Sequence, residues 1–444
     1  MVADGGGFFR HPGLLAVLAN LQGDCQGAWR QACSTASLPP IRNARRGTSL
    51  KRLYSLDALR GVAALSVVIW HWQHFYAITG TWQAVWHRED QPFFWLLKPL
   101  YLEGWAAVDL FFALSGFVFF WLYAGPIREG KARAGKFALL RFSRLYPLFF
   151  LTLILALVLQ TAFHGITGKY FIFEIGDWGR FAANLLVLQQ WVPPNTDQYF
   201  NGPAWTVSIE AVLYVLFFLL CRVGLNGWKS ALVVSLCGIF LFHWNWFIAR
   251  GLMGFFLGGV AYFVFAKLKA HSNARLISRL LGILALALWA VVVIEILYGP
   301  LHAAGSWLSD RVPDDWDYYS DNADDIFHVL YIYTVIPITI VALALQEEML
   351  GRSYKRLSYL GDISYSTYML HFPLQIGCAL MALTFGFGPA LFMHGWAMIA
   401  FYAVLIGLGS LSYRFYEKPM QALVRGLPAR FAAKAISPSA GPPA

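Results

Sequence analysis

Charged side chains interrupt several long apolar runs of this sequence, and their spacing is suited to chemistry. Asp57, Arg60 and His71 all lie in or at the edge of the first run. Asp57 and Arg60 are three residues apart, so a helix would bring them together as an ion pair. Arg60 and His71 are eleven residues apart, which is about 1100° of rotation and about 16 Å of rise, so they share one helix face. That face would carry an ion pair at one end and an imidazole, a natural general base, at the other. A snorkelling ion pair and an interfacial histidine would give the same pattern.

Three further apolar runs contain ionisable groups. Asp109, Glu210 and His371 each lie among apolar residues, where a charge costs at least a few kcal/mol and marks a functional candidate. A carboxylate beside an imidazole can orient it for proton transfer. The step Ser115-Gly116 would let another helix, or a slender ligand, approach closely, and helix packing is the more common use of such a step.

Two arginines, Arg141 and Arg144, stand where another apolar run begins. They are three residues apart, so a helix would place both guanidinium groups on one face. Two planar guanidinium forks suit an anionic ligand, above all a phosphate. Anchoring of the chain by positive charge at the cytoplasmic surface explains the same pair equally well.

Composition indicates which elements position these residues. Of the 444 residues, 58% are hydrophobic and 13% are charged, and the mean hydropathy is +0.54. Soluble globular proteins have about 45–50% apolar and about 25% charged residues. Apolar runs of about 20 residues can cross a bilayer as helices, so the sequence predicts an all-α, polytopic transmembrane helix bundle of about ten spans. The predicted spans are 56–76, 105–124, 142–163, 206–221, 228–244, 247–266, 279–298, 327–345, 359–384 and 391–412.

Positive charge falls on every second predicted connection and around both ends of the membrane region, whereas the connection at 299–326 is acidic. By the positive-inside rule, the basic connections and both termini are cytoplasmic. We therefore expect an N-terminal cytoplasmic tail at 1–53, a transmembrane domain at 54–419 and a C-terminal cytoplasmic tail at 420–444. The expected location is the cytoplasmic (inner) membrane of a bacterium.

This topology divides the candidate residues between the two sides of the membrane. Acid–base groups on one side and an anion clamp on the other suit a reaction whose donor comes from inside and whose acceptor comes from outside. The outer group comprises His71, Asp109 and Glu210, and the cytoplasmic group comprises Arg60, Arg141 and Arg144.

Other kinds of site find little support in the sequence. The five cysteines are scattered without a CxxC pair, and the eleven histidines show no HxxxH or HxxE spacing within a span. We therefore expect neither a disulfide framework nor a metal site. Cytoplasmic loops account for the formal net charge of +10, so we expect no nucleic-acid partner.

Five segments in order resemble the motifs of the acyltransferase 3 family of membrane-bound O-acyltransferases, and together they span 54–419. Ala107 stands where that family usually has glycine, and Thr206 where it has serine. The resemblance is to the stand-alone form, because the sequence ends soon after its last predicted span without a hydrolase-like domain. The five segments are Leu56–Gly61 followed by His71 (LDxLRG…H), Ala107–Phe117 (GVDLFFxLSGF), Arg141–Pro147 (RxxRxxP), Trp205–Glu210 (WSLSxE) and Leu360–His371 (LGxxSYxxYxxH).

The resemblance implies an activity. Members of the family move an acyl group, commonly acetyl, from cytoplasmic acyl-CoA to sugars of surface polysaccharides, glycolipids or secreted molecules. A sugar hydroxyl is a poor nucleophile and needs a base whose pKa lies near 7, which an imidazole supplies. His71 is then the expected base, oriented by Glu210 or Asp109. Direct transfer and a covalent acyl-histidine intermediate both stay open.

The other motif residues are expected to bind the donor or to support the site. Arg141 and Arg144 would hold the phosphates of CoA, and the pantetheine arm would pass along the Ser115-Gly116 step. Arg60, paired with Asp57, would shape the helix or the donor passage. Supporting roles are expected for Trp205, Ser208, Tyr365, Tyr368 and His371.

Two other classes of function are compatible with a polytopic membrane protein. A transporter or flippase would use the intramembrane charges as a path for a polar or anionic solute, without dependence on acyl-CoA. An acyl-sensing or scaffolding protein with an inactive site is disfavoured by the intact His71 and the intact pair of Arg141 and Arg144.

Overall fold

The computed structural model of the protein describes nearly all of the predicted membrane domain. Almost all of the predicted N-terminal tail at 1–53 lies outside the described residues, as do the middle of the acidic connection and the end of the C-terminal tail. The described helices belong to one unit of the chain, Leu53–Ala444. The described residues are 52–79, 87–174, 177–191, 200–242, 244–309, 323–352 and 354–436.

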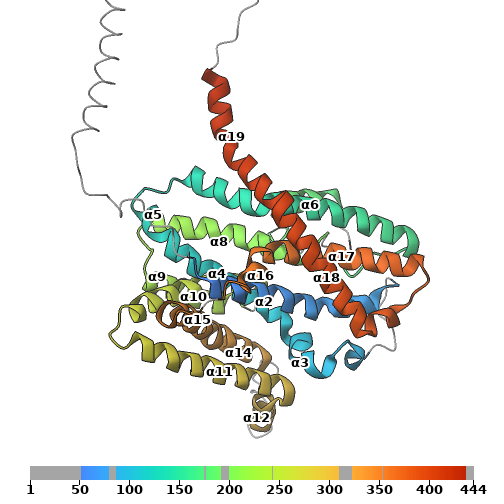
Figure 1. Ribbon diagram of the computed structural model, residues 1–444, viewed down its shortest axis with the longest axis horizontal. Helices are drawn as coiled ribbons and strands as arrows, with labels where there is room; N and C mark the ends of the chain where they lie inside the picture. The colour runs from blue at the N-terminus through green and yellow to red at the C-terminus, as the bar shows by residue number, and fades with distance from the viewer. Residues whose placement is uncertain are drawn as a thin grey trace, which may run out of the picture. The chain divides into compact units, whose positions relative to one another are not determined.

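The described residues form helices joined by turns, and no β-strand occurs among them, so the predicted all-α class is confirmed (Figure 1). A helix satisfies its own backbone hydrogen bonds, which apolar surroundings require. The helices that run through the membrane domain are α2 (Tyr54–Trp70), α4 (Ala107–Leu122), α6 (Ala134–Thr167), α8 (Trp205–Arg222), α10 (Trp246–Lys269), α11 (Ala274–Tyr298), α15 (Ile336–Leu350), α17 (Ser364–Thr384) and α18 (Gly395–Ser412). The other elements are η1 (His71–Ala77), η2 (Arg88–Asp90), α3 (Phe94–Glu103), η3 (Gly104–Ala106), α5 (Ala124–Arg128), α7 (Trp178–Leu185), η4 (Gly202–Ala204), α9 (Trp228–Phe240), α12 (Pro300–Ser309), α14 (Ala323–Leu330), η6 (Tyr331–Val335), α16 (Ser358–Asp362), η7 (Pro389–Met393), η8 (Tyr413–Glu417) and α19 (Lys418–Ile436).

Seven of the described stretches are long and apolar enough to cross a membrane, and the chain is an integral, multi-pass membrane protein. Three other predicted spans form helices that are shorter or less apolar than these seven. Helix α9 has 13 residues, which is about 20 Å at 1.5 Å per residue. Helix α2 has 17 residues before it tightens into η1, and α17 contains buried polar side chains. The count of ten spans and their orientation stay predictions.

Three predicted spans differ in detail from the helices that form. The span at 359–384 divides at Ile363 into α16 and α17. The span at 327–345 passes through a π-helical turn, η6, between α14 and α15. Helix α6 has 34 residues and begins earlier than predicted, so Arg141 and Arg144 lie within a helix and not before one.

Helices α4 and α10 approach each other closely through glycines on both sides. A Cβ added at Gly116 would lie 1.7 Å from the carbonyl oxygen of Phe255, and one at Gly258 would lie 1.9 Å from that of Ala113. Small residues permit such a close helix crossing. Gly116 therefore packs against α10, and its expected place along the donor passage is corrected. Ser115 lies about 100° away around the helix and faces another neighbour.

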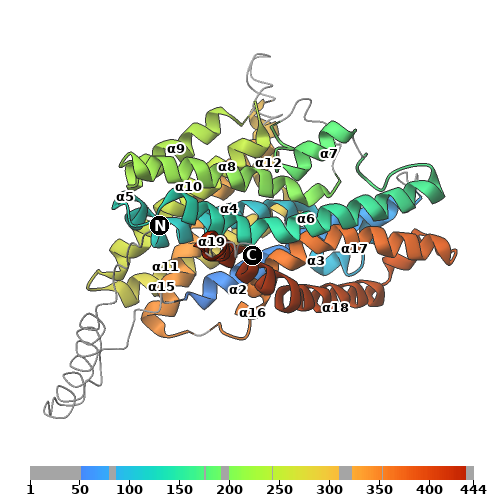
Figure 2. The same cartoon turned by 90° about the horizontal axis from the view of Figure 1, so that it is seen from above.

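A second close contact joins α2 to α16. A Cβ at Gly61 would lie 2.4 Å from the Cβ of Leu360, and one at Gly361 would lie 2.1 Å from the carbonyl oxygen of Asp57. Helix α2 also contacts α4 and α17. Figure 2 shows α4, α6, α17 and α18 running along a common direction, so α2 lies among helices that carry the other motifs.

Replacing Gly116 by alanine should destabilise the protein, because the new methyl group would overlap the Phe255 carbonyl and push α4 away from α10. Overpacking of this kind costs about 1–3 kcal/mol. Gly125→Ala is the matched control, because nothing lies within 4 Å of a Cβ built at Gly125. Thermal unfolding in detergent compares the variants, and equal midpoints for the two would contradict this packing.

Candidate active site

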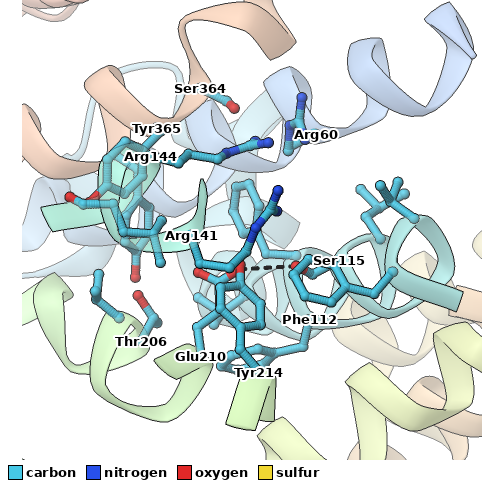
Figure 3. A pocket seen from close by; sticks show the side chains of 18 residues that line it. Arg60, Phe112, Ser115, Arg141, Arg144, Thr206, Glu210, Tyr214, Ser364 and Tyr365 are labelled. Atoms are coloured by element: carbon cyan, nitrogen blue, oxygen red, sulfur yellow. Dashed lines mark hydrogen bonds between the residues drawn. The ribbon is translucent and has the colours of Figure 1, made fainter. Parts of the chain in front are cut away.

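A cavity of about 110 Å³ lies between α2, α4, α6, α8 and α17 (Figure 3). We call it the arginine cavity, because Arg60, Arg141 and Arg144 all line it. Ser115 and Glu210 contribute further polar groups to its wall. The structure therefore brings together residues from four of the five motif segments, and the fifth contributes the tyrosines described below.

Arg141 is held in place by aromatic rings. One of its Nη atoms donates a hydrogen bond to the Tyr123 hydroxyl at 2.7 Å. Its guanidinium carbon lies 5.0 Å from the ring centroids of both Phe119 and Tyr123, within the range of favourable cation–π contacts. Arg144 lies one turn further along α6 and is exposed. Figure 3 shows the side chain of Arg144 pointing toward Arg60, the third arginine of this cavity.

The predicted ion pair of Asp57 and Arg60 forms on α2. Nη2 of Arg60 donates to Oδ1 of Asp57 at 2.7 Å and lies 3.4 Å from the carbonyl oxygen of Gly361. Because Gly361 also packs against the backbone of Asp57, the pair links α2 to α16. Arg60 thereby keeps a fixed position at the wall of the arginine cavity.

Glu210 belongs to the arginine cavity and not to the surroundings of His71. Its Oε1 accepts a hydrogen bond from Ser115 Oγ at 2.9 Å and a short one from the Tyr214 hydroxyl. Helix α8 begins at Trp205, and Glu210 follows five residues later. The two side chains are therefore about 140° apart around the helix axis and point in different directions. The expectation that Glu210 orients His71 is corrected by these contacts.

A chain of hydrogen bonds fixes His71 and also its tautomer. Nδ1 of His371 lies 2.5 Å from the carbonyl oxygen of Tyr368, which can only accept, so that nitrogen carries the proton and Nε2 keeps a lone pair. This lone pair faces Nδ1 of His71 at 3.1 Å, and the same Nδ1 lies 3.0 Å from the carbonyl oxygen of Val67. His71 is therefore protonated at Nδ1, which leaves the lone pair of a general base on Nε2.

Gln375, one turn after His371 on α17, completes this cluster. Its amide nitrogen donates to the backbone carbonyl of His71 at 2.8 Å, and its amide oxygen lies 3.2 Å from Nδ1 of His74. Gln375 and His371 are both fully buried. Helix α17 therefore positions both the backbone and the imidazole of His71.

His71 lines a second cavity, of about 520 Å³, which we call the histidine cavity. Val108 and Tyr368 line both the histidine cavity and the arginine cavity, so the two cavities adjoin at these side chains. Three charged residues, Arg88, Glu103 and Arg250, also reach the histidine cavity. Its aromatic wall is formed by Trp70, Trp105, Trp205, Trp246 and Phe247.

Asp109 is held away from His71 by a buried ion pair with Arg250. Nε and Nη2 of Arg250 donate to the two carboxylate oxygens at 2.8 and 3.0 Å, and Nε2 of His328 lies 3.2 Å from Oδ2. The side chain of Asp109 is 0% exposed and that of Arg250 is 4% exposed. Since both carboxylate oxygens are engaged, the expected role of Asp109 in orienting His71 is corrected.

Three tryptophans surround the guanidinium of Arg250. Its central carbon lies 4.7 Å from the ring of Trp105, 5.3 Å from that of Trp246 and 5.6 Å from that of Trp205. These cation–π contacts compensate part of the cost of burying the charge. Trp205, for which a supporting role was expected, thus packs against this ion pair and also lines the histidine cavity.

The tyrosines of α17 and the serine of α8 tie helices together around the cavities. The Tyr365 hydroxyl donates to a backbone carbonyl of α6 at 2.6 Å, and the Tyr368 hydroxyl donates to one of η4 at 3.0 Å. Ser208 Oγ donates to the carbonyl of Val187 at 2.7 Å. Tyr365 and Tyr368 also line the arginine cavity, whereas Ser208 is fully buried and supports the loop before α8.

Four important residues are absent from the set that sequence reasoning selects. Arg250 and His328 lie in apolar runs, so the rule that singles out Asp109 applies to them too. Gln375 follows His371 by four residues, and Tyr214 follows Glu210 by four, so helix spacing places each beside a selected residue. Within the described ranges, no group of three or more His, Cys, Asp or Glu residues is arranged to hold a metal ion.

Known proteins resemble this chain over most of its length. Residues 53–414 match the model of the acyltransferase 3 family, described as an acyltransferase domain. O-acetyltransferase OatA of Staphylococcus aureus is 23% identical over 422 residues, which cover 84% of this chain and 58% of OatA. Acyltransferase MdmB of Streptomyces mycarofaciens is 31% identical over 177 residues, which cover 37% of this chain and 38% of MdmB. Protein 2 in the picA locus of Rhizobium radiobacter is 32% identical over 180 residues, which cover 38% of this chain and 81% of that protein. No solved structure matches the chain.

The fold and the two adjoining cavities define a multi-pass membrane protein with a polar site inside its helix bundle. The family match covers well over half of the chain, so the protein belongs to the acyltransferase 3 family. The resemblance of the five motif segments is thereby confirmed. The chain spans 38% of the length of MdmB and 58% of that of OatA.

Breaking the pair of Asp109 and Arg250 should destabilise the protein strongly, because Arg250→Gln leaves a buried carboxylate without its countercharge. Removal of one partner from a buried ion pair costs about 3–5 kcal/mol. Lys131→Gln is the control, since Lys131 pairs with Glu129 at an exposed position, and it should leave the unfolding midpoint in detergent unchanged. Adding Asp109→Asn to Arg250→Gln should recover part of the loss. A double variant that is no more stable than Arg250→Gln would show that the two side chains are not coupled.

Proposed function

We propose that this protein is a membrane-embedded O-acyltransferase that moves an acyl group, most simply acetyl, from cytoplasmic acyl-CoA to a hydroxyl of a carbohydrate or glycolipid. The observation that carries the proposal is the meeting of the arginine cavity and the histidine cavity at Val108 and Tyr368. A thioester that enters from one cavity and a hydroxyl that enters from the other would come together beside His71. The names of the relatives, O-acetyltransferase OatA and acyltransferase MdmB, support the type of reaction.

The arginine cavity suits the donor. Its volume of about 110 Å³ suits the acyl thioester end of the donor but not the nucleotide of CoA. The phosphates would therefore lie at its mouth, where the exposed Arg144 and the oriented Arg141 offer two guanidinium forks. Ser115, held by Glu210, would contact the arm from the opposite wall.

The histidine cavity suits the acceptor and the chemical step. Nε2 of His71 takes the proton of the acceptor hydroxyl while the oxygen forms a bond to the thioester carbonyl carbon. The tetrahedral intermediate then breaks its C–S bond, and the leaving thiolate takes the proton back from the imidazolium. A path through an acyl-histidine would use the same Nε2 atom as the nucleophile. The wall of the histidine cavity consists of flat aromatic rings and a few polar groups, and these suit a sugar ring.

The proposal also assigns a direction across the membrane. The arginine cavity faces the cytoplasm, where acyl-CoA is made, and the histidine cavity faces the outer half of the bilayer. Basic connections on every second loop support this orientation, with both termini in the cytoplasm. The membrane is then the cytoplasmic (inner) membrane of a bacterial cell.

Replacing His71 by alanine should abolish acyl transfer without preventing folding, because the imidazole is the only base assigned to the step. Loss of a general base lowers the rate by about 10²–10⁴-fold. The measurement is release of free CoA from acetyl-CoA by purified protein in lipid bilayers. His74→Ala is the control and should have a smaller effect, since His74 contacts Gln375 and does not line the histidine cavity.

Near-normal release of CoA by the His71→Ala variant would remove His71 from its role. If the native protein released no CoA under any condition but moved a solute across the membrane, the transporter alternative would replace the proposal.

The double change Arg141→Lys and Arg144→Lys should weaken acyl-CoA binding while leaving insertion into the membrane intact. Lysine keeps the charge that anchoring needs but loses the bidentate fork that phosphate recognition uses. Each lost charge-assisted hydrogen bond costs about 1.5–3 kcal/mol, which is roughly tenfold or more in affinity. Calorimetry at low salt measures the dissociation constant, and rising salt should weaken binding to the native protein. Unchanged affinity in the double variant would leave the arginines as topology signals and would place the donor elsewhere.

A further inference from the structure

A third cavity, of about 450 Å³, lies beside the histidine cavity and is walled by α2, α3, η3, α4, α11, α14 and η6. We call it the lateral cavity. Helix α11 forms one side of it. Other helices cover little of α11, because only 11% of its most apolar 18-residue segment is buried. Figure 1 shows α11 at the edge of the helices that carry the site. A cavity behind so peripheral a helix lies next to the lipid.

The wall of the lateral cavity is apolar, apart from a few polar groups. Its surface is formed by leucine, valine, alanine, isoleucine, proline, phenylalanine and tryptophan side chains, and no arginine or lysine of the described ranges lines it. Val62 is 50% exposed and Leu96 is 60% exposed, so its rim is open toward the side of the bundle. The polar groups at its wall come from Ser66, Glu103, His328 and Tyr331.

Two side chains connect this cavity with the proposed site of reaction. Glu103 and Trp105 line both the lateral cavity and the histidine cavity. Helix α2 contributes to both from neighbouring faces, whose centres lie about 110° apart at 100° of rotation per residue. Leu59, Val62, Ala63 and Ser66 line the lateral cavity, whereas Val67 and His71 line the histidine cavity.

We propose that the lateral cavity binds the hydrocarbon chain of a membrane-anchored acceptor, whose polar head enters the histidine cavity past Glu103 and Trp105. This inference rests on the proposed function and adds the class of acceptor, an amphiphile with a hydroxyl-bearing head. Only a molecule already in the bilayer can enter an apolar opening at the side of a membrane helix bundle. Lipid tails are as apolar as the cavity wall, so the site gains little from the hydrophobic effect. Its contribution is to hold the head group at a fixed distance from His71.

The chemistry of the cavity walls distinguishes the site for the acceptor's hydrocarbon chain from the site for the donor. The donor carries phosphates, and the three arginines suited to them line the arginine cavity, on the other side of Val108 and Tyr368. A hydrocarbon chain on the acceptor needs no such groups. The acceptor therefore enters from the side and the donor from the cytoplasm, so neither blocks the path of the other.

Photolabelling tests this site directly. The probe is dodecyl glucoside with a diazirine at the end of its chain, added to the native protein in phosphatidylcholine bilayers. We expect adducts on the cavity-facing residues of α11 and η6, with competition by unlabelled dodecyl glucoside but not by methyl glucoside. Val62→Phe and Val293→Phe, which narrow the cavity from α2 and from α11, should each reduce the labelling several-fold. Leu286→Phe is the control on α11, because Leu286 is 73% exposed and does not line the cavity.

Three results would overturn the inference. Equal labelling by a phosphatidylcholine with the same diazirine would mean that bulk lipid fills the cavity. Labelling of the cavity by a long-chain acyl-CoA probe, but not by the glucoside, would assign it to the donor. Labelling that responds equally to Val62→Phe, Val293→Phe and Leu286→Phe would show no specific site.

A parallel measurement of CoA release from acetyl-CoA by the native protein separates this inference from the proposed function. Absence of CoA release would remove the proposed function itself. CoA release that depends on His71, together with any of the three overturning results, would remove only the lateral site.

Discussion

A charge buried among apolar membrane helices must be paired, and the pair of Asp109 and Arg250 is the contact on which this site depends. Asp109 belongs to α4 and Arg250 to α10, so the bidentate contact fixes the rotation of one helix against the other. Gly116 and Gly258 allow the backbones to approach closely enough for the pair to form. This arrangement turns Ser115 toward Glu210. The ion pair and the arginine cavity therefore share one helix, α4, which contributes Asp109 to the pair and Ser115 to the cavity.

Helix α2 is the element that relates the three cavities to one another. Arg60 lines the arginine cavity and His71 lines the histidine cavity, one on each side of the contact between them. A neighbouring face of the same helix, which includes Val62, lines the lateral cavity. Because α2 is locked to α16 through Gly61 and Gly361, these faces keep fixed directions. A single rigid helix can therefore set the distances between donor, base and acceptor.

The base is oriented by neutral groups and not by a carboxylate. His371 and the carbonyl oxygens of Val67 and Tyr368 hold His71 in one tautomer. A carboxylate would do the same and would also stabilise the imidazolium that forms during the reaction. The two carboxylates expected to do so, Asp109 and Glu210, are engaged with Arg250 and with Ser115 and Tyr214, respectively. The base is thus oriented without a carboxylate from this pair, and Arg250, a cation at the wall of the histidine cavity, is itself paired with Asp109.

The sequence by itself determined the class of the protein and most of the residues at the site. Run length and composition require membrane helices, since a helix is the structure that satisfies an apolar backbone locally. Spacing along one helix predicted the pair of Asp57 and Arg60, because intrahelical geometry is fixed by 3.6 residues per turn. Only the tertiary structure decided which carboxylate meets which cation, because Asp109, Arg250 and His328 lie on three helices. The rotation and register of one helix against another depend on the packing of all side chains between them, and no local spacing in the sequence records that.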